Sequence, residues 1–410
     1  MPSKFLQIHT LTSYPATLLN RDDAGFAKRL PFGGSTRLRV SSQCLKRHWR
    51  RSESDHALGQ IAYDEGTAPL TVRSRLTFHR EIYQPLLADG VAEERAYAVT
   101  EALIDALLGK SKGRAAKAAK DSEEAFVKAT EDALGTGQVT VLGRPEVEWL
   151  KDRARDFLAA HDEPKAIQKA VKEYFKKDAK KNLAQLADQL GMGLDAALFG
   201  RMVTSDILAR YDAAVHVAHA FTVHAAEIEP DYFSAVDDIV QAEGELGSGH
   251  INTMELTSGL YYSYVVIDVP LLVSNLEGCA RQDWSTVDRT LAAEVVRRFV
   301  HLVATTTPGA KLGSTAPYSV AQMMVVEAGA EAPRTLANAF AEPVRSSGQI
   351  VSDTYDRLTE HLADLDQVYG APSDGRQALA LGPKERLGQA VGRFVNLGQL
   401  AEWSAEKVAE

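Results

Sequence analysis

The sequence predicts an α+β protein in which a long helical segment interrupts a set of β-strands. Short runs with strand character occur in the first forty residues, at 4–11 and 37–40. Residues 57–190 are instead rich in Ala, Leu, Glu and Lys, with apolar residues three to four positions apart, the spacing of helices. Strand character returns later and is strongest at 257–269. This order of strands, helices and strands is typical of an α+β fold with a helical insertion.

The first fifty residues predict a strand, a basic loop, a second strand and a helix, in that order. Turn-forming residues fill the stretch after the first strand, including Pro-Phe-Gly-Gly at 31–34. Basic and apolar side chains alternate at 37–40, as in a half-buried strand. Ser41 or Ser42 can cap a helix that runs through Trp49.

The helical segment 57–190 carries two basic clusters, at 110–120 and 165–181. Lysines dominate both clusters, and alanines are interspersed among them. Solvated helix surfaces are the simplest interpretation of either cluster.

The chain after residue 190 alternates between strands, helices and one irregular excursion. Residues 225–255 lack clear periodicity, are rich in Asp, Glu and Gly, and are too long for a connecting turn, which predicts a projecting loop or irregular hairpin. The other elements predicted are strands at 196–203 and 213–223, a helix at 284–303, a buried strand at 323–327, a helix at 351–368 and a polar, helical last forty residues.

The composition is that of a globular protein of the cytoplasm. Of 410 residues, 45% are hydrophobic and 25% are charged, which is enough to build a sizeable core. No run reaches the roughly 18–20 apolar residues of a membrane span, and the first twelve residues lack the apolar centre of a signal peptide. Cys44 and Cys279 are too few for a disulfide framework or a cysteine zinc site.

The charge distribution is polarised. The whole chain has a net charge of −9, which by itself argues against a polyanionic partner. Residues 1–51, however, hold ten basic residues against Asp22 and Asp23, a net of +8 that leaves −17 on the remainder. Such a chain can hold a nucleic acid on one surface and stay soluble through the other.

Motifs spread along the chain resemble one known family. The segments concerned are Ile8-His9-Thr10-Leu11, Leu19-Asn20-Arg21-Asp22-Asp23, Phe32-Gly33-Gly34, residues 39–47, Gly200-Arg201-Met202-Val203-Thr204-Ser205, residues 233–238, Ser258-Gly259, Pro308-Gly309-Ala310-Lys311 and Leu336-Ala337-Asn338-Ala339-Phe340. Together they resemble the CasC family, the guide-RNA-binding (crRNA-binding) backbone subunit of the type I-E CRISPR Cascade surveillance complex.

The resemblance implies a hand-shaped molecule. Its palm would be a modified RRM-like, or ferredoxin-like, sheet, with helical fingers inserted early and a thumb projecting later. The expected parts are palm at 1–56, fingers at 57–190, palm at 191–224, thumb at 225–256 and palm with C-terminal helices at 257–410. Several copies would stack along one guide RNA, and each thumb would displace a nucleotide.

The resemblance also implies the residues that hold the RNA backbone: Arg21, Lys28, Ser41, Gln43, Lys46 and Arg50. The physical interpretation of these residues agrees, because a single-stranded backbone is bound by cations and by hydroxyl or amide donors along a groove. On a helix capped at Ser41 or Ser42, Gln43, Lys46 and Arg50 fall on one face. The alternative is a surface stripe of ordinary charges.

The resemblance places four more residues against RNA bases: Met202, Tyr232, Phe233 and Ile251. Tyr232, Phe233 and Ile251 fall in the thumb, where apolar side chains would wedge between bases, although a lone Met202 is more often a core residue. Tyr262 and Tyr264 could form the stacking platform of an RRM, but the basic-Gly-aromatic signature of that module is missing. Core packing is the better interpretation of that tyrosine pair.

Enzyme chemistry finds little support. His216, His219 and His224 do not form a metal site on a strand, because His219 would face away from the other two. Asp237 and Asp238 are the stronger candidate, since paired carboxylates can hold magnesium and would make the protein a metal-dependent endoribonuclease of a CRISPR effector. No third carboxylate or basic partner adjoins them, so solvated thumb residues, or a salt bridge to a neighbouring subunit, are favoured.

Together with these residues, the resemblance implies a non-catalytic RNA-binding protein of antiviral defence, with no cofactor and no metal. Its expected partners are crRNA, target DNA, further copies of itself and other Cascade subunits, in a cytoplasmic ribonucleoprotein without membrane contact. Base pairing by the guide would supply the sequence specificity. A helical scaffold without nucleic acid is a third possibility, which co-purification of RNA would exclude.

Overall fold

The computed structural model describes residues 3–63, 66–67, 69–109, 123–177, 193–201, 212–236, 248–309 and 315–410. The chain divides into two compact units. Unit 1 comprises Met1–Leu58, Val215–Val269 and Arg289–Glu410, and unit 2 comprises Gly59–Ala214 and Pro270–Asp288. The predicted mixed α+β class is confirmed, while the domain boundaries expected at 56, 190, 224 and 256 stay predictions.

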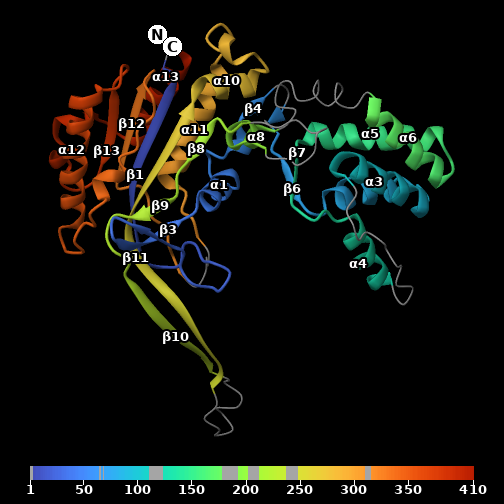
Figure 1. Ribbon diagram of the computed structural model, residues 1–410, viewed down its shortest axis with the longest axis horizontal. Coiled ribbons are helices and arrows are strands. Elements are labelled where there is room, and N and C mark those ends of the chain that lie inside the picture. The colour runs from blue at the N-terminus through green and yellow to red at the C-terminus, as the bar shows by residue number, and fades with distance from the viewer. Residues whose placement is uncertain are drawn as a thin grey trace. The chain divides into compact units, whose positions relative to one another are not determined.

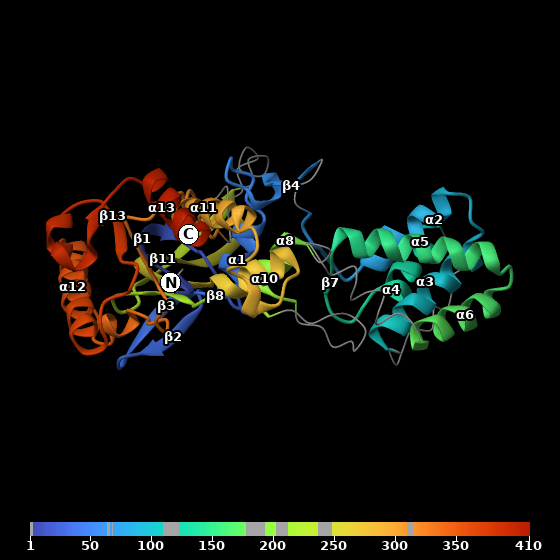
Figure 2. The ribbon, with the colours of Figure 1, turned by 90° about the horizontal axis from the view of Figure 1, so that it is seen from above.

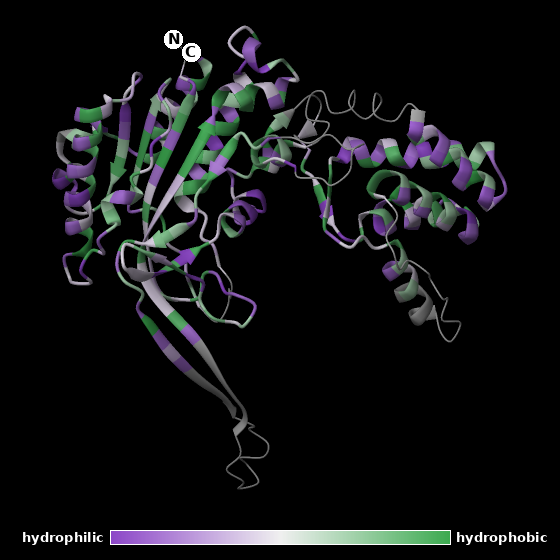
Figure 3. Cartoon of the chain, in the orientation of Figure 1, coloured by the Kyte–Doolittle hydropathy of each residue, from purple (hydrophilic) through white to green (hydrophobic). Residues whose placement is uncertain are grey.

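Unit 1 is built on one large, mostly antiparallel sheet (Figure 1). Its strands lie in the order β14 (Arg393–Phe394), β13 (Arg376–Ala380), β12 (Met323–Gly329), β1 (Phe5–Thr17), β11 (Ser248–Asp268), β9 (Ala220–Thr222), β3 (Ser35–Val40) and β2 (Arg29–Phe32). β8 (Val215–Val217) and β10 (Ile228–Val236) also pair with β11. Figure 3 shows apolar residues concentrated along these strands, as burial of the sheet requires.

Side chains of strand β1 point alternately to the two faces of the sheet. The strand pairs with β11 from Phe5↔Asp268 and with β12 from Phe5↔Gly329. Because side chains alternate along a strand, even-numbered β1 residues face one side and odd-numbered ones the other. Thr10 and Thr12 meet Trp49 of helix α1 (Ser42–Arg50) around a cavity of about 30 Å³. Leu11 instead packs in the core beneath helix α12 (Ile350–Tyr369), so α1 and α12 cover opposite faces.

The other helices of unit 1 agree in part with the ranges predicted from the sequence. The helix expected at 351–368 is α12. The helix expected at 284–303 begins only at Thr290 and is α11 (Thr290–Thr305), which packs against α13 (Leu397–Ala409). The helical prediction for the last forty residues is wrong in part, because β13 pairs with β12 there and tertiary pairing overrides local propensity.

A hairpin of β10 and β11 extends from the sheet (Figure 1). Its pairing runs from Ile228↔Thr257 to Val236↔Ser248, whereas β11 pairs with β1 only from Thr257 onward. The excursion predicted at 225–255 therefore contains a projecting hairpin, and 237–247 lie outside the described residues.

Unit 2 is mostly helical. Helices α3, α5 and α6 pack side by side in both views (Figures 1 and 2). Its helices are the π-helical turn His79–Tyr83, α2 (Gln84–Ala88), α3 (Glu93–Leu108), α4 (Glu123–Leu134), α5 (Arg144–Ala160), α6 (Pro164–Lys177), α8 (Leu194–Phe199) and most of α10 (Val269–Glu277), and its short strands are β4 (Ala62–Tyr63), β5 (Gly66–Thr67), β6 (Val72–Ser74) and β7 (Thr140–Leu142). None of the helices in the described ranges is long and apolar enough to cross a bilayer.

The strand predicted at 196–203 is wrong over 196–199, because Leu194–Phe199 forms helix α8, and 202 and 203 lie outside the described residues. The run Leu-Asp-Ala-Ala-Leu-Phe is short and apolar, and periodicity cannot distinguish a buried strand from a buried helix over so few residues. Gly193 and Gly200 bound the helix at φ values of +91° and +75°, which only glycine adopts easily.

Candidate nucleic-acid interface

Helix α1 forms as its sequence predicts. Ser41 caps it, with its hydroxyl accepting a hydrogen bond from Cys44 N at 3.3 Å, and Ser41 N donates to Asn20 Oδ1 at 3.0 Å. Leu45 and Trp49, one helical turn apart, are buried on the inner face. The outer residues of α1 are thereby displayed beside the loop that follows β1. Ser41 itself is buried and serves the cap.

The loop from Asn20 to Lys28 is closed by its own hydrogen bonds. Asp22 accepts from Phe26 N through its carboxylate at 2.9 Å, and Lys28 N donates to Asn20 O at 2.9 Å. Glu255, at the base of the β10–β11 hairpin, accepts from Ala27 N at 2.8 Å. The loop that carries the exposed Arg21 is therefore held between α1 and the hairpin.

Lys28 lies next to two other cations. Arg39 N on β3 donates to Lys28 O at 2.8 Å, and Arg47 on α1 acts together with Lys28 on the Cys44 thiol. Arg39 Nη1 donates to His219 Nδ1 at 2.9 Å. Partial burial, with the charges of Arg39 and Lys28, lowers the pKa of His219. Burial raises the pKa of the Cys44 thiol, while the charges of Arg47 and Lys28 oppose that rise. We call Lys28, Arg39 and Arg47 the basic cluster; no described acidic side chain forms an ion pair with any of them.

Two of the ten basic residues in 1–51 are engaged within the protein. Arg37 is fully buried, and its guanidinium donates to Thr222 O at 3.0 Å and to Phe340 O at 2.9 Å. Burial, aided by the charge of Arg357, lowers its pKa. Arg29 forms an ion pair with Glu255. The positive charge available to a nucleic acid is therefore smaller than the net +8 of residues 1–51 implies.

The residues predicted to bind the RNA backbone differ in how exposed their side chains are and in whether they interact with other groups of the chain. Arg21 and Gln43 are exposed, and Lys28 is half-buried within the basic cluster. Lys46 and Arg50 are half-buried and interact with other groups of the chain. The structure thus brings these residues to one side of unit 1, around α1 and the loop before β2.

The predicted base-contacting residues are described only in part. Tyr232 and Phe233 lie on β10, opposite Thr253 and Asn252, and Ile251 lies on β11 opposite Ser234. Only the backbone is described there, and Met202 lies outside the described residues. Their predicted contacts stay predictions.

The motif residues next to Met202 have a structural role. Arg201 is fully buried in unit 2 and forms an ion pair with Glu146 at 2.5 Å. Glu146 Oε2 also accepts from Gly143 N at 2.8 Å at the start of α5. This buried pair ties the end of α8 to the first turn of α5.

Sequence reasoning missed Arg39 and His219 as partners. The sequence pattern marks Arg39 only as part of a basic strand and His219 only as a candidate metal ligand. Within the described ranges no group of three or more His, Cys, Asp and Glu side chains could hold a metal ion. His224 is engaged elsewhere: its Nδ1 donates to Ala225 O at 2.7 Å and its Nε2 accepts from Leu260 N at 3.2 Å.

Tyr262 is a core residue, as predicted. It is 1% exposed, its hydroxyl lies 2.9 Å from His9 Nδ1, and Leu336 N donates to that hydroxyl at 3.0 Å. Tyr264 donates to Gln7 Oε1 at 2.7 Å on the same face. Neither tyrosine lies on the α1 side of the sheet, so the pair forms no stacking platform beside the basic cluster.

Comparison with known proteins shows which family this chain belongs to. The model of the CT1975-like protein family matches residues 6–403. This chain belongs to that family. A solved chain titled "CRISPR RNA-guided surveillance complex, pre-nicking" is 27% identical with a TM-score of 0.74, covering 98% of this chain and 100% of that one. The resemblance to CasC-type backbone subunits of CRISPR surveillance complexes is confirmed.

A second solved chain, titled "CRISPR RNA-guided surveillance complex", shares the fold. It is 24% identical with a TM-score of 0.65, and covers 98% of this chain and 99% of that one. No curated protein sequence matches this member of the CT1975-like family.

Proposed function

We propose that this CT1975-like protein binds crRNA as the repeating backbone subunit of a type I-E Cascade complex and presents the spacer to target DNA. Its unit 1 would act as an RRM-like palm, the β10–β11 hairpin as the thumb, and unit 2 as the fingers. Copies would stack along the guide beside the other Cascade subunits.

The observation that carries the proposal is the basic cluster. Lys28, Arg39 and Arg47 lie together without a described carboxylate to neutralise them, on a chain whose remaining sequence is strongly acidic. A local cation group on an acidic protein concentrates phosphates at one place instead of over the whole surface. Contacts from cations to a backbone give affinity without sequence preference, which suits a subunit that must hold any guide.

Expression with the neighbouring genes of its own locus tests the proposal. We expect RNA of one discrete length to co-purify with the protein, because a fixed number of stacked copies protects a fixed length. A protein that purifies with its companions but without RNA would contradict it.

We further propose that the subunit cuts neither RNA nor DNA. The rival residues Asp237 and Asp238 lie outside the described residues, and the sequence offers them no adjoining carboxylate. Assembled protein incubated with complementary labelled RNA and magnesium should leave that RNA intact. A cut that disappears in the Asp237→Ala, Asp238→Ala variant would establish the endoribonuclease instead.

A further inference from the structure

Unit 1 contains a cavity of about 350 Å³ on the face of the sheet covered by α12. Side chains of β1, of the loop after β12 and of the end of α12 line it, among them Gln7, Glu331, Ala332, Leu365, Tyr369 and Pro372. A volume of about 300–1,000 Å³ with mainly apolar walls and a few polar groups is usual for a ligand pocket. Because α1 lies on the opposite face, this cavity is separate from the basic cluster.

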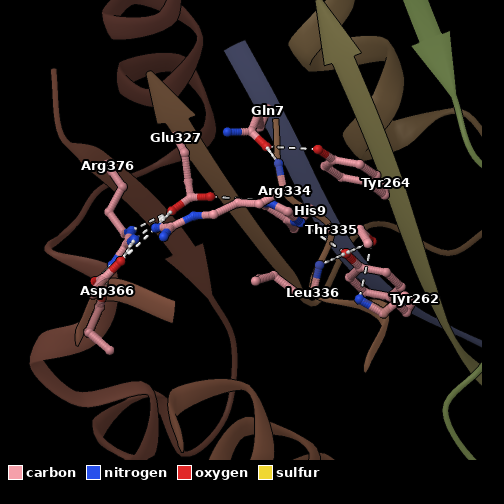
Figure 4. A network of polar contacts seen from close by, with 12 residues as sticks. Gln7, His9, Tyr262, Tyr264, Glu327, Arg334, Thr335, Leu336, Asp366 and Arg376 are labelled. Carbon is pink, nitrogen blue, oxygen red and sulfur yellow. Dashed lines mark hydrogen bonds and ion pairs between the residues drawn. The ribbon is translucent and has the colours of Figure 1, made fainter. Parts of the chain in front are cut away.

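Gln7 presents a donor to this cavity. Its Oε1 accepts from Arg334 N at 2.6 Å and from Tyr264 Oη at 2.7 Å. Both partners are donors, so the orientation of the amide is fixed. Figure 4 shows the amide nitrogen on the side away from Arg334 and Tyr264. Gln7 is 6% exposed, and its Nε2 donates to no group of the described chain.

The wall behind Gln7 is rigid and electrically neutral. Arg334 binds Glu327 at 3.1 Å and Asp366 at 2.5 Å, and it donates to Gly370 O at 2.9 Å. Its charge is therefore matched within the protein, and Gln7 adds an amide donor to this wall.

The rim of the cavity carries an exposed acidic side chain, Glu331. Its carboxylate accepts a hydrogen bond from Ser373 N at 3.1 Å and forms no ion pair with a described residue. A phosphate backbone is repelled by such a rim, whereas a Lys or Arg side chain is attracted to it.

Apolar surface continues outside the cavity. Tyr369 is 77% exposed and the adjoining Val368 is 70% exposed. Exposed aromatic and aliphatic side chains beside a pocket are typical of protein interfaces, where Tyr is enriched. A small molecule buried in the cavity would leave this surface uncovered, but a chain segment would cover it.

We infer that this cavity docks an extended segment of another protein. An aliphatic side chain of that segment enters the cavity, a backbone carbonyl accepts the hydrogen bond from Gln7 Nε2, and a flanking Lys or Arg faces Glu331. The inference does not depend on RNA binding by the basic cluster.

Blocked tripeptides titrated into the full-length protein test this docking site, with binding followed by NMR at the side-chain amide of Gln7. Acetyl-Lys-Leu-Lys-amide should shift that amide with a Kd on the order of 1 mM, a weak affinity suited to so short a probe. Acetyl-Lys-Gly-Lys-amide and acetyl-Glu-Leu-Glu-amide should each bind about tenfold more weakly, because one lacks the aliphatic side chain and the other is repelled by the rim.

A matched pair of variants locates the binding. Ala332→Phe fills the cavity from an exposed loop and should abolish binding, whereas Ala363→Phe, exposed on α12 outside the cavity, should not. Equal binding of all three peptides, no shift at Gln7, or full binding by Ala332→Phe would overturn the inference. So would a lower sedimentation mass of Ala332→Phe alone, which would assign the cavity to a second copy of this chain. RNA affinity should be the same in both variants, which keeps this test independent of the proposed function.

Discussion

At the scale of single residues, the sheet is held by a carboxylate that the sequence gives no reason to expect in a core. Glu327 on β12 is fully buried between His9, Arg334 and Arg376 (Figure 4). Burial alone would raise its pKa, but the proximity of His9, Arg376 and Arg334 outweighs burial and holds the pKa well below its usual range. A buried ion group of this kind is costly to break, because removing one member leaves the charges of the others less well compensated.

Glu327→Gln should lower the free energy of unfolding at pH 7 by about 3 kcal/mol, the low end of the usual cost of breaking a buried ion group, because Asp366 still pairs with Arg334 and Arg376. Since the folded pKa lies below the unfolded value of about 4.3, this contribution is complete above that pH and is lost as the pH falls through the folded pKa. The difference between wild type and variant in the free energy of unfolding, measured by urea denaturation, should therefore become smaller below about pH 4. Glu360→Gln, exposed on α12, serves as the control and should change little; a difference that is independent of pH would contradict the assignment.

At the scale of elements, the hairpin of β2 and β3 is fixed to the 3-10 turn η4 (Ala337–Phe340) and the residue after it. Arg37 donates to Phe340 O, and Gly33 lies so close to Ala341 that a Cβ would fall 1.4 Å from its carbonyl oxygen. The basic strand β3 is thereby placed against β9, where Arg39 meets His219.

Gly33→Ala and Gly34→Ala form a matched pair for this docking. Both glycines have positive φ, +57° and +75°, so both variants should lose about 1–2 kcal/mol from backbone strain. Only Gly33→Ala also pushes the hairpin from Ala341, since a Cβ on Gly34 has nothing within 4 Å. Gly33→Ala should therefore bind RNA more weakly than Gly34→Ala in a fluorescence titration. Equal RNA affinities would show that the docking does not position the basic cluster.

The β10–β11 hairpin allows a test of stacking along the guide. Replacing residues 229–253 by a short Gly-Ser linker keeps Glu255, which anchors the Asn20–Lys28 loop, and keeps the part of β11 that pairs with β1. The variant should stay folded and bind a short RNA as a single subunit, but it should lose regular spacing on a full guide. Nuclease probing of the RNA complex reads this spacing, and an unchanged period would be the contrary result.

How far the sequence predicts the elements depends on whether a local signal exists. Ser41 as N-cap and the alternating strand at 37–40 carry local signals, and both are found. The strand error at 196–199 and the late start of α11 at Thr290 come from short or apolar runs whose form is decided by packing.

At the scale of the whole molecule, the candidate interface is assembled from segments far apart in the chain. Lys28, Arg39 and Arg47 are close in sequence, but their partners follow the helical segment. His219 pairs with Arg39, and Glu255 accepts a hydrogen bond from the Asn20–Lys28 loop. Sequence patterns show which residue types are present, and only the sheet topology shows which of them meet. The burial of Arg37 could not be inferred for the same reason, because its partners are the backbone carbonyls of Thr222 and Phe340.

The salt dependence of RNA affinity tests the central claim most directly. Lys28→Glu with Arg47→Glu removes two cations of the basic cluster, and Arg345→Glu with Arg393→Glu makes the same change in net charge at exposed positions elsewhere in unit 1. Each phosphate contact on a single strand contributes about 0.7 to the slope of log K against log salt, so the first variant should lose about 1.4 from the slope and bind far more weakly. The control variant should keep the wild-type slope. Wild-type affinity and slope in the Lys28→Glu, Arg47→Glu variant would show that the RNA lies elsewhere on the molecule.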